Sequence, residues 1–304
     1  MKPFKSILEF QKHFATDETC RLYLEERRWG KQAACPFCAS VNATRIKEGK
    51  RFQCNEKECR KQFSATVGTF MENTKVPLTK WFLAMYILSN HSKGMSSMQL
   101  AVWLDVTQKT AWFMNHRIRQ SHIDKEPGLL DGIVEVDETF IGGKIKNKHA
   151  WKRKEMDTND NKTIVFGAVS RTGKIVTMII PDRTKETLMA AVYSKARKGA
   201  VIVSDENTGY SDLKIDYRHA KINHAEGEYS RGAAHTNTVE GFWNILKKQI
   251  VGIHHVVSPK HLQRYCDEVT FRYNNRFTEQ DARFAGALSN CEGRLTYKQL
   301  IAKA

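Results

Sequence analysis

Four cysteines within 25 residues constrain the fold of this 304-residue chain more than any other feature. Their spacing is Cys35-x2-Cys38-x15-Cys54-x4-Cys59, two knuckles separated by a stretch long enough for a β-hairpin. Tetrahedral zinc needs four thiolates at about 2.3 Å, and two short turns joined by a strand pair supply them without a large core. The pattern therefore predicts a zinc ribbon over residues 31–66 with one structural Zn²⁺.

Two disulfides are the alternative for these cysteines, but the chain shows no sign of export. Its first residues, MKPFKSILEFQKHF, mix charges with apolar side chains and contain no signal-peptide core. The longest apolar run, residues 81–88, is far shorter than the ~20 residues of a membrane helix. We therefore expect a cytoplasmic protein with reduced thiols and no membrane partner. The isolated cysteines are predicted to be packing residues: Cys20, Cys266 and Cys291.

The net charge of +16 indicates a polyanionic partner. Residues 1–130 contain 21 lysines and arginines against 12 acids, and residues 131–304 contain 28 against 21. Because both halves are basic, we favour nucleic acid bound along the whole molecule over a generic solubilising surface.

Residues 75–125 carry the helical periodicity of a helix-turn-helix, after an N-terminal helical segment over residues 1–30. We expect Thr79 to cap a first helix, Ser96 or Ser97 a second, and Thr107 a third, with a tight turn at residues 105–106. In this arrangement the helix after the turn reads DNA, although any helical hairpin gives a similar pattern. Its candidate DNA-binding residues are Gln108, Lys109, Thr110, Asn115, Arg117 and Arg119.

A β-branched run, GIVEVDETFIGGK, begins a strand-rich domain near residue 130. Ile133, Glu135 and Asp137 lie on one face of this expected strand, and Val134 and Val136 on the other. Two further strands, TIVFGAVS and KIVTMII, flank a hairpin loop over residues 171–174. The charged stretch over residues 144–162 is predicted to be a basic loop.

A second acid, Asp205, lies where the strand in GAVIVSDENTGY breaks into a polar turn, after a candidate helix over residues 185–198. A carboxylate among apolar residues is costly unless it is paired or binds a cation. Strand ends are also where open α/β sheets place ligands. The alternative is an ordinary turn former.

The stretch HTNTVEGFWNILKK, residues 235–248, is predicted to form an amphipathic helix capped by Thr236 to Thr238. Its acid, Glu240, lies in the first turn, and Lys247 and Lys248 follow two turns later. Glu240 could simply offset the positive helix end. In the functional interpretation its carboxylate meets the two aspartates, while Lys247 contacts a DNA phosphate.

These blocks, together with HHVVSPKHLQRYCDEVTFRYNNR, resemble the ISXO-like bacterial insertion-sequence transposases of the DDE class over nearly the whole chain. The resemblance implies a multidomain protein whose zinc ribbon and helix-turn-helix precede an α/β ribonuclease-H-like catalytic domain with a mixed sheet, residues 130–280, and a tail over 281–304. By it, Asp137, Asp205 and Glu240 match the acidic triad, and Lys247 the basic residue that follows. Asn237 is the competing third ligand because some relatives are thought to use asparagine.

The same resemblance implies a transposase that binds terminal inverted repeats, cuts the element's ends and joins them to target double-stranded DNA. Two Mg²⁺ or Mn²⁺ ions would neutralise the charge that opposes attack on a phosphodiester. A homodimer assembled on DNA, in the cytoplasm and associated with the bacterial nucleoid, is expected. The alternatives are a DNA-binding regulator and a nuclease without strand transfer.

Overall fold

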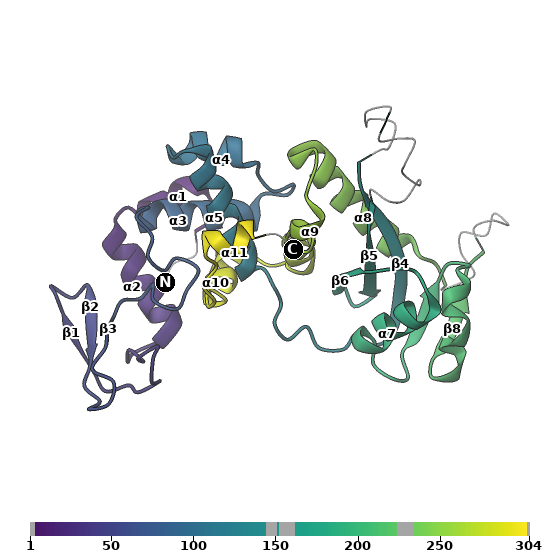
Figure 1. The fold of residues 1–304 in the computed structure, drawn as a ribbon, viewed down its shortest axis with the longest axis horizontal. Coiled ribbons are helices and arrows are strands. Elements are labelled where there is room, and N and C mark those ends of the chain that lie inside the picture. Colours follow the sequence, from purple (N-terminus) through teal and green to yellow (C-terminus); the bar gives the residue numbers. More distant parts are fainter. Residues whose placement is uncertain (1–3, 144–150, 152–161, 224–233, 303–304) are drawn as a thin grey trace. The chain divides into compact units, whose positions relative to one another are not determined.

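The computed structural model describes residues 4–143, 151, 162–223 and 234–302 (Figure 1). The chain forms two compact units, one of residues 1–123 with 277–304, the other of residues 124–276. The predicted basic loop falls outside the described residues except at positions 151 and 162. None of the helices in these described ranges has the length and apolar character needed to cross a membrane.

The first unit is mainly helical and carries a small three-stranded antiparallel sheet in the order β1-β2-β3. Its elements are α1 (Ile7–His13), α2 (Asp17–Trp29), β1 (Ala43–Ile46), β2 (Arg51–Cys54), β3 (Gln62–Phe63), α3 (Leu78–Asn90), α4 (Ser97–Leu104), α5 (Gln108–Ser121), α10 (Gln280–Ser289) and α11 (Tyr297–Ile301).

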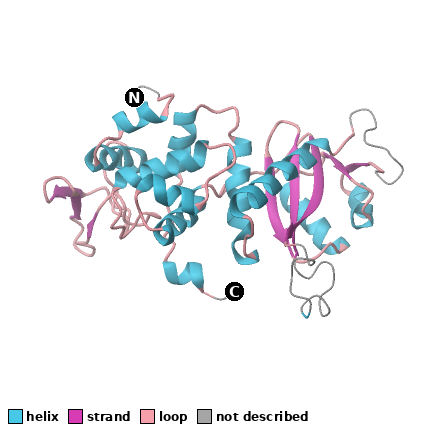
Figure 2. Ribbon diagram, turned by 90° about the horizontal axis from the view of Figure 1, so that it is seen from above, coloured by secondary structure: helices cyan, strands magenta, loops and turns pink. Residues whose placement is uncertain are grey.

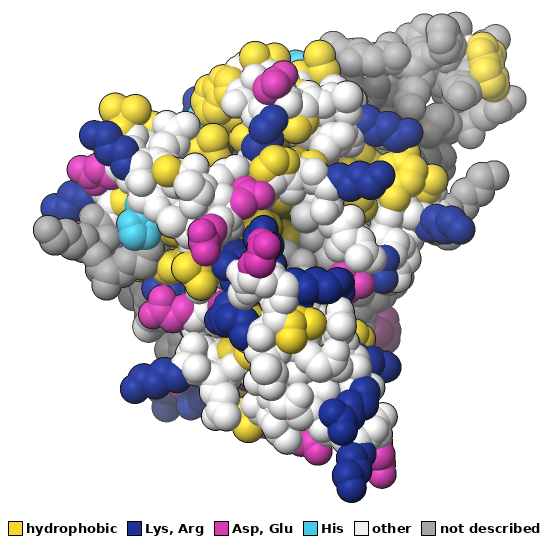
Figure 3. Space-filling view, turned by 90° about the vertical axis from the view of Figure 1, so that its left-hand side faces the viewer, with side chains coloured by type: hydrophobic (Ala, Val, Ile, Leu, Met, Phe, Trp, Pro, Cys, Tyr) yellow, Lys and Arg dark blue, Asp and Glu magenta, His cyan; other side chains and the backbone are white. Residues whose placement is uncertain are grey.

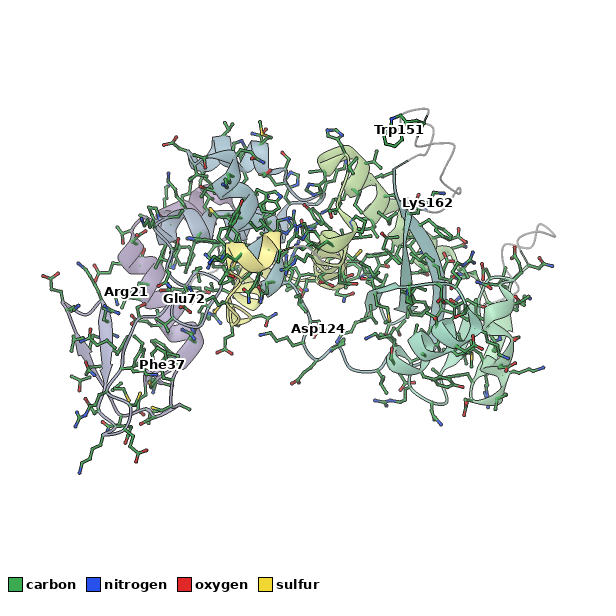
Figure 4. All side chains as sticks on the ribbon, in the orientation of Figure 1. Arg21, Phe37, Glu72, Asp124, Trp151 and Lys162 are labelled. Atoms are coloured by element: carbon green, nitrogen blue, oxygen red, sulfur yellow. The ribbon has the colours of Figure 1, made fainter. Side chains whose placement is uncertain are left out.

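Two arginines and one glutamate attach the small sheet to α2. Arg21, labelled in Figure 4, donates from Nη1 to Glu25 at 2.7 Å and to the carbonyl of Gly49 at 2.8 Å. Arg45 reaches the other oxygen of Glu25 at 2.8 Å. Because Glu25 is buried, these ion pairs offset the cost of removing its charge from water.

The C-terminal residues complete the first unit instead of forming a tail. Phe284 of α10 is fully buried and contacts aromatic rings of α1, α2 and α3, including Phe10, Tyr23 and Phe82. The expectation of a tail over residues 281–304 was therefore wrong, because these residues supply part of the apolar core that the helices of the N-terminal region share.

The helices over residues 78–121 begin close to where the sequence predicts. Ser96 and Thr107 cap α4 and α5 by accepting hydrogen bonds from Gln99 N and Thr110 N. Thr79 does not cap α3, which begins after Pro77 without a side-chain cap. The amide of Thr79 instead donates to Asp17 Oδ1 at 3.0 Å, so α2 supplies the acceptor.

The second unit is built on a mixed five-stranded sheet in the order β6-β5-β4-β7-β8. The first three strands are antiparallel neighbours, and β4, β7 and β8 run parallel. Its elements are β4 (Ile133–Gly142), β5 (Lys162–Ser170), β6 (Ile175–Ile180), α7 (Lys185–Lys195), β7 (Val201–Ser204), the 3₁₀ segment η2 (Thr208–Ile215), β8 (Arg218–Lys221), α8 (Asn237–Gln249), the π-helical turn η4 (Ile250–His254) and α9 (Pro259–Asn274).

Two apolar cores cover the two faces of this sheet, which Figure 2 shows between its helices. Val134 and Val136 of β4 pack with α7 and η2 on one face. Ile141 and residues of β5 pack with α8 and α9 on the other. The alternation predicted for residues 133–137 therefore holds, since successive side chains of a strand point to opposite faces.

Candidate active site

Strand register places Asp137 beside Asp205. In the parallel pairing of β4 and β7, Glu135 lies opposite Val203. Asp137 and Asp205 each follow two residues later, at the point where β7 has ended and a polar turn begins. Burial, followed by the charges of Glu138 and Asp205, raises the pKa of Asp137 to about 7. Two of the three predicted acids therefore interact directly through their charges.

Asp137 is held by hydrogen bonds to both carboxylate oxygens. The backbone N–H of Glu138 donates to Oδ1 at 2.8 Å, and the indole Nε1 of Trp243 donates to Oδ2 at 2.9 Å. Gly167, opposite Asp137 on β5, leaves the space that this indole fills. A Cβ atom at Gly167 would lie 2.6 Å from ring carbons of Trp243.

The third predicted acid, Glu240, lies in the first turn of α8, one turn before Trp243. It is exposed and accepts a hydrogen bond from Thr236 Oγ1 at 2.8 Å. The competing ligand, Asn237, is also exposed, at the first position of the helix. The carboxylate oxygens of Asp137, Asp205 and Glu240 are further apart than the sulfur atoms of the four cysteines described below.

Two exposed basic residues lie on the same helix as Glu240. Lys247 and Lys248 are exposed in the last turn of α8, while its predicted apolar face is buried. A phosphate chain could therefore follow the exposed face of α8 from Glu240 toward the lysines.

The start of α8 differs from the expectation. Thr236 is the N-cap residue but makes no side-chain capping bond. The capping acceptor is the carboxylate of Glu135, which takes the N–H of Thr238 at 2.9 Å and of Val239 at 3.2 Å. A strand residue more than 100 positions earlier therefore replaces the predicted threonine cap.

The chemistry of this cluster fits a divalent cation. Asp137, Glu138 and Asp205 place negative charges close together in a partly buried site, and a cation would relieve their mutual repulsion. Carboxylate oxygens are the ligands that Mg²⁺ and Mn²⁺ prefer. Asp137 and Asp205 are the residues that could hold such an ion, with Glu240 or Asn237 adding a third ligand from α8.

The four cysteines of the ribbon converge as the spacing predicts. Their sulfur atoms all lie within 4.8 Å of one another, with 3.7 Å between Cys35 and Cys59 and 3.6 Å between Cys38 and Cys54. Four thiolates around tetrahedral zinc would be about 3.8 Å apart. The cluster therefore supports a structural zinc. Cys20, Cys266 and Cys291 are buried, which confirms them as packing residues.

The predicted DNA-reading residues divide into an exposed and a buried group. Gln108 and Lys109 are exposed at the start of α5, and Thr110 is half-buried. Asn115, Arg117 and Arg119 are buried, so the expectation that they contact DNA is wrong for this structure.

Arg117 shows what these buried side chains do. Its guanidinium donates to the carbonyls of Leu295 and Glu72, each at 3.1 Å, and lies over the ring of Phe113. Burial lowers the pKa of Arg117 to about 10. Arg117 therefore joins α5 to the C-terminal residues of the same unit. Elsewhere basic side chains are spread over the surface among acids, as on the face in Figure 3.

Sequence reasoning missed two glutamates that flank Asp137. Glu135 is fully buried, and the side chain of Glu138 is only 1% exposed. The alternation of β4 already placed Glu135 on the face of Asp137, but its partners lie on elements distant in sequence. Glu138 contacts Arg183, Asn207 and Tyr210.

Comparisons with known proteins match two regions of the chain to protein families. Residues 129–274 match the model of the ISXO2-like transposase domain, and residues 15–62 match that of the transposase zinc-ribbon domain. The chain belongs to the ISXO2-like transposases. The matched regions of this transposase include the two aspartates, α8 and the four cysteines.

Two further similarities accompany the family match. This transposase is 25% identical, over 269 residues, to a Halobacterium salinarum protein described as an uncharacterized protein in transposable element ISH50. The alignment covers 84% of this chain and 90% of that protein. A crystal structure of a pre-cleavage Mos1 transpososome aligns with 97% of this chain and 100% of that chain, at 10% identity. Its TM-score of 0.28 is too low to inform the fold.

Proposed function

We propose that this transposase binds the terminal inverted repeats of an insertion sequence, cuts the DNA at their ends and joins the ends to target DNA in a reaction that requires Mg²⁺ or Mn²⁺. The observation that carries the metal-dependent part is the juxtaposition of Asp137 and Asp205 across the β4–β7 register. Family membership supports the action on DNA.

In this proposal the second unit is a ribonuclease-H-like catalytic domain, and its mixed sheet supports that assignment. Asp137 and Asp205 hold the metal ions, and Glu240 completes the set from α8, with Asn237 as the alternative. Two bound ions would activate the attacking oxygen and stabilise the leaving oxygen of an in-line displacement. The protein orients Asp137 through Trp243 and the amide of Glu138, so its oxygens are fixed before DNA arrives.

The exposed lysines of α8 would hold the DNA backbone. Lys247 lies about 10 Å along the helix axis from Glu240, at 1.5 Å per residue. A phosphate bound there would be neutralised while the scissile phosphate lies at the acids. Lys248 would extend the same contact along the strand.

For recognition of the repeats we propose the zinc ribbon together with the helix-turn-helix of α4 and α5. The first residues of a recognition helix contact base edges. Gln108, Lys109 and Thr110 occupy this position in α5 and supply polar and charged side chains. Because one reaction couples two DNA ends, we propose that the protein works as a homodimer assembled on DNA.

The proposal is tested with purified protein and a labelled duplex that carries the repeat flanking its gene, in Mg²⁺. Cleavage at the repeat end, followed by joining of the new 3′ end to an added target duplex, is expected. Cleavage without joining would indicate a nuclease, and specific binding without cleavage in Mg²⁺ or Mn²⁺ would indicate a DNA-binding regulator.

A further inference from the structure

Glu135 fastens the start of α8 to the strand that carries Asp137. Its Oε2 accepts the N–H groups of Thr238 and Val239, and its Oε1 accepts the hydroxyl of Thr238 at 2.9 Å. The free N–H groups of a helix start favour a negative charge. Arg171 donates to Oε1 at 3.1 Å, so the buried charge is also paired.

These four hydrogen bonds occupy the roughly four lone-pair sites that a carboxylate offers. Glu135 is therefore not available as a metal ligand, although it lies two residues from Asp137 on the same strand face. His235 Nδ1 lies 3.3 Å from the same Oε1, and the carbonyl of His235 accepts from Arg171. The chain leading into α8 is thereby tied to the same carboxylate.

Glu138 plays a corresponding part on the opposite face of β4. Its Oε2 accepts from Arg183 Nε at 3.1 Å and from Asn207 Nδ2 at 3.3 Å, and its Oε1 accepts from Tyr210. Asn207 in turn shapes the turn after β7. Its N–H donates to Asp205 Oδ1 at 3.1 Å, and its own Oδ1 accepts the N–H of Gly209 at 3.0 Å.

We propose that Glu135 and Glu138 are positioning residues, which hold the two elements that bring the other metal ligands to Asp137. Glu135 fixes the first turn of α8, which carries Asn237 and Glu240. Glu138 fixes the turn that carries Asp205. This inference rests on the proposed metal-dependent function. The positioning role also explains why the buried side chains of Glu135 and Glu138 flank Asp137 on β4.

Local amide exchange in protein free of Mg²⁺ and Mn²⁺ tests the two links separately. Glu135→Gln should lower the protection of the amides at residues 238–240 by about tenfold and leave residues 207–209 unchanged. Glu138→Gln should do the reverse. Glu268→Gln is the matched control, because Glu268 is also buried in this unit and paired with an arginine, Arg272. It should change neither segment.

A Mn²⁺ titration of the same proteins then separates positioning from simple structural support. Both variants should bind Mn²⁺ at least about fivefold more weakly than the wild type, because a displaced ligand costs about 1 kcal/mol or more. Glu268→Gln should bind as the wild type does. Should either glutamate variant fail to fold, Thr238→Val removes the hydroxyl bond to Glu135 and keeps the charge. Asn207→Ala keeps the charge of Glu138 and removes the amide bond to it, together with the bond from the N–H of Gly209, so the amides of residues 207 and 208 are the ones compared. They should give the same local pattern.

Unchanged exchange at both segments in folded variants would overturn the assignment. Altered exchange with wild-type Mn²⁺ affinity would also overturn it, since the glutamates would then support the fold without positioning ligands. A wild-type protein that binds no Mn²⁺ would refute the proposed metal-dependent function itself, and the exchange data would still show whether the two links exist.

Discussion

The indole nitrogen of Trp243 donates a hydrogen bond of 2.9 Å to Oδ2 of Asp137. This contact joins the buried face of α8 to the first acid of the candidate site. It depends on Gly167, where any side chain would collide with the indole. The orientation of Asp137 therefore depends on how α8 packs against β5.

Gly167→Ala should therefore disturb both stability and the site. The added methyl would lie 2.6 Å from the ring of Trp243, so the indole or the strand must move. We expect a loss of about 1–3 kcal/mol in the free energy of unfolding, measured in urea. Gly286→Ala is the control, because a Cβ at that helical glycine meets no atom within 4 Å. Equal stability of the two variants would contradict this account of Gly167.

Asp137 should make the protein less stable as pH rises when Mg²⁺ and Mn²⁺ are absent. Its folded-state pKa of about 7 exceeds its ordinary value of 3.8, so the folded state binds more protons between these pH values. The stabilising effect of that proton is lost as pH rises through 7. We therefore compare the free energy of unfolding of Asp137→Asn with that of the wild type at each pH. The difference in favour of the variant should be larger at pH 8 than at pH 5, by roughly 1–4 kcal/mol.

Urea unfolding of both proteins at the two pH values, with zinc retained, measures this difference. Added Mn²⁺ should stabilise the wild type at pH 8 and have little effect on Asp137→Asn. A difference that does not change with pH would show that the carboxylate of Asp137 keeps an ordinary pKa.

Lys109 and Arg117 should have opposite roles although both lie on α5. Lys109→Ala should weaken binding to the terminal repeat and lower the salt dependence by about one unit of slope per lost phosphate contact, with no change in melting temperature. Arg117→Ala should lower the melting temperature, because two backbone carbonyls lose their donor. Fluorescence anisotropy at several salt concentrations and thermal unfolding check the two effects. A stable Arg117→Ala protein would contradict the structural role.

Purified protein should contain about one zinc per chain, bound by Cys35, Cys38, Cys54 and Cys59. Replacing Cys35 and Cys54 together with serine should remove the metal and unfold the ribbon, because a site with two thiolates cannot close it. Elemental analysis measures the metal content. Cys20→Ser is the control, since this buried cysteine lies outside the cluster. Full zinc retention in the double variant would contradict the assignment.

Local sequence patterns predicted the features that depend on neighbouring residues. Cysteine spacing gave the zinc cluster, and alternation gave the two faces of β4. The change from apolar residues to a polar turn placed Asp205 at a strand end, and β7 ends at Ser204. Each of these features follows from a period or spacing within about 25 residues, which can be read from the sequence alone.

Contacts between distant segments could not be predicted in this way. Arg117 donates a hydrogen bond to the carbonyl of Leu295, which lies 178 residues further along the chain. Glu135 caps a helix that begins more than 100 residues later. Basic side chains on α5 suggested an exposed surface, but residues 114–119 are all buried. The local pattern of α5 does not predict that C-terminal residues such as Leu295 pack against it.

The most direct test compares Asp137→Asn, Asp205→Asn and Glu240→Gln in repeat cleavage and strand transfer with Mg²⁺ or Mn²⁺. Each substitution keeps the side-chain shape and removes one negative charge, so chemistry should be lost while repeat binding is almost unchanged. Asn237→Ala tests the competing ligand: if it is inactive while Glu240→Gln is active, Asn237 supplies the third ligand. If Asp137→Asn and Asp205→Asn both cut and join DNA at the wild-type rate, the proposed mechanism is wrong.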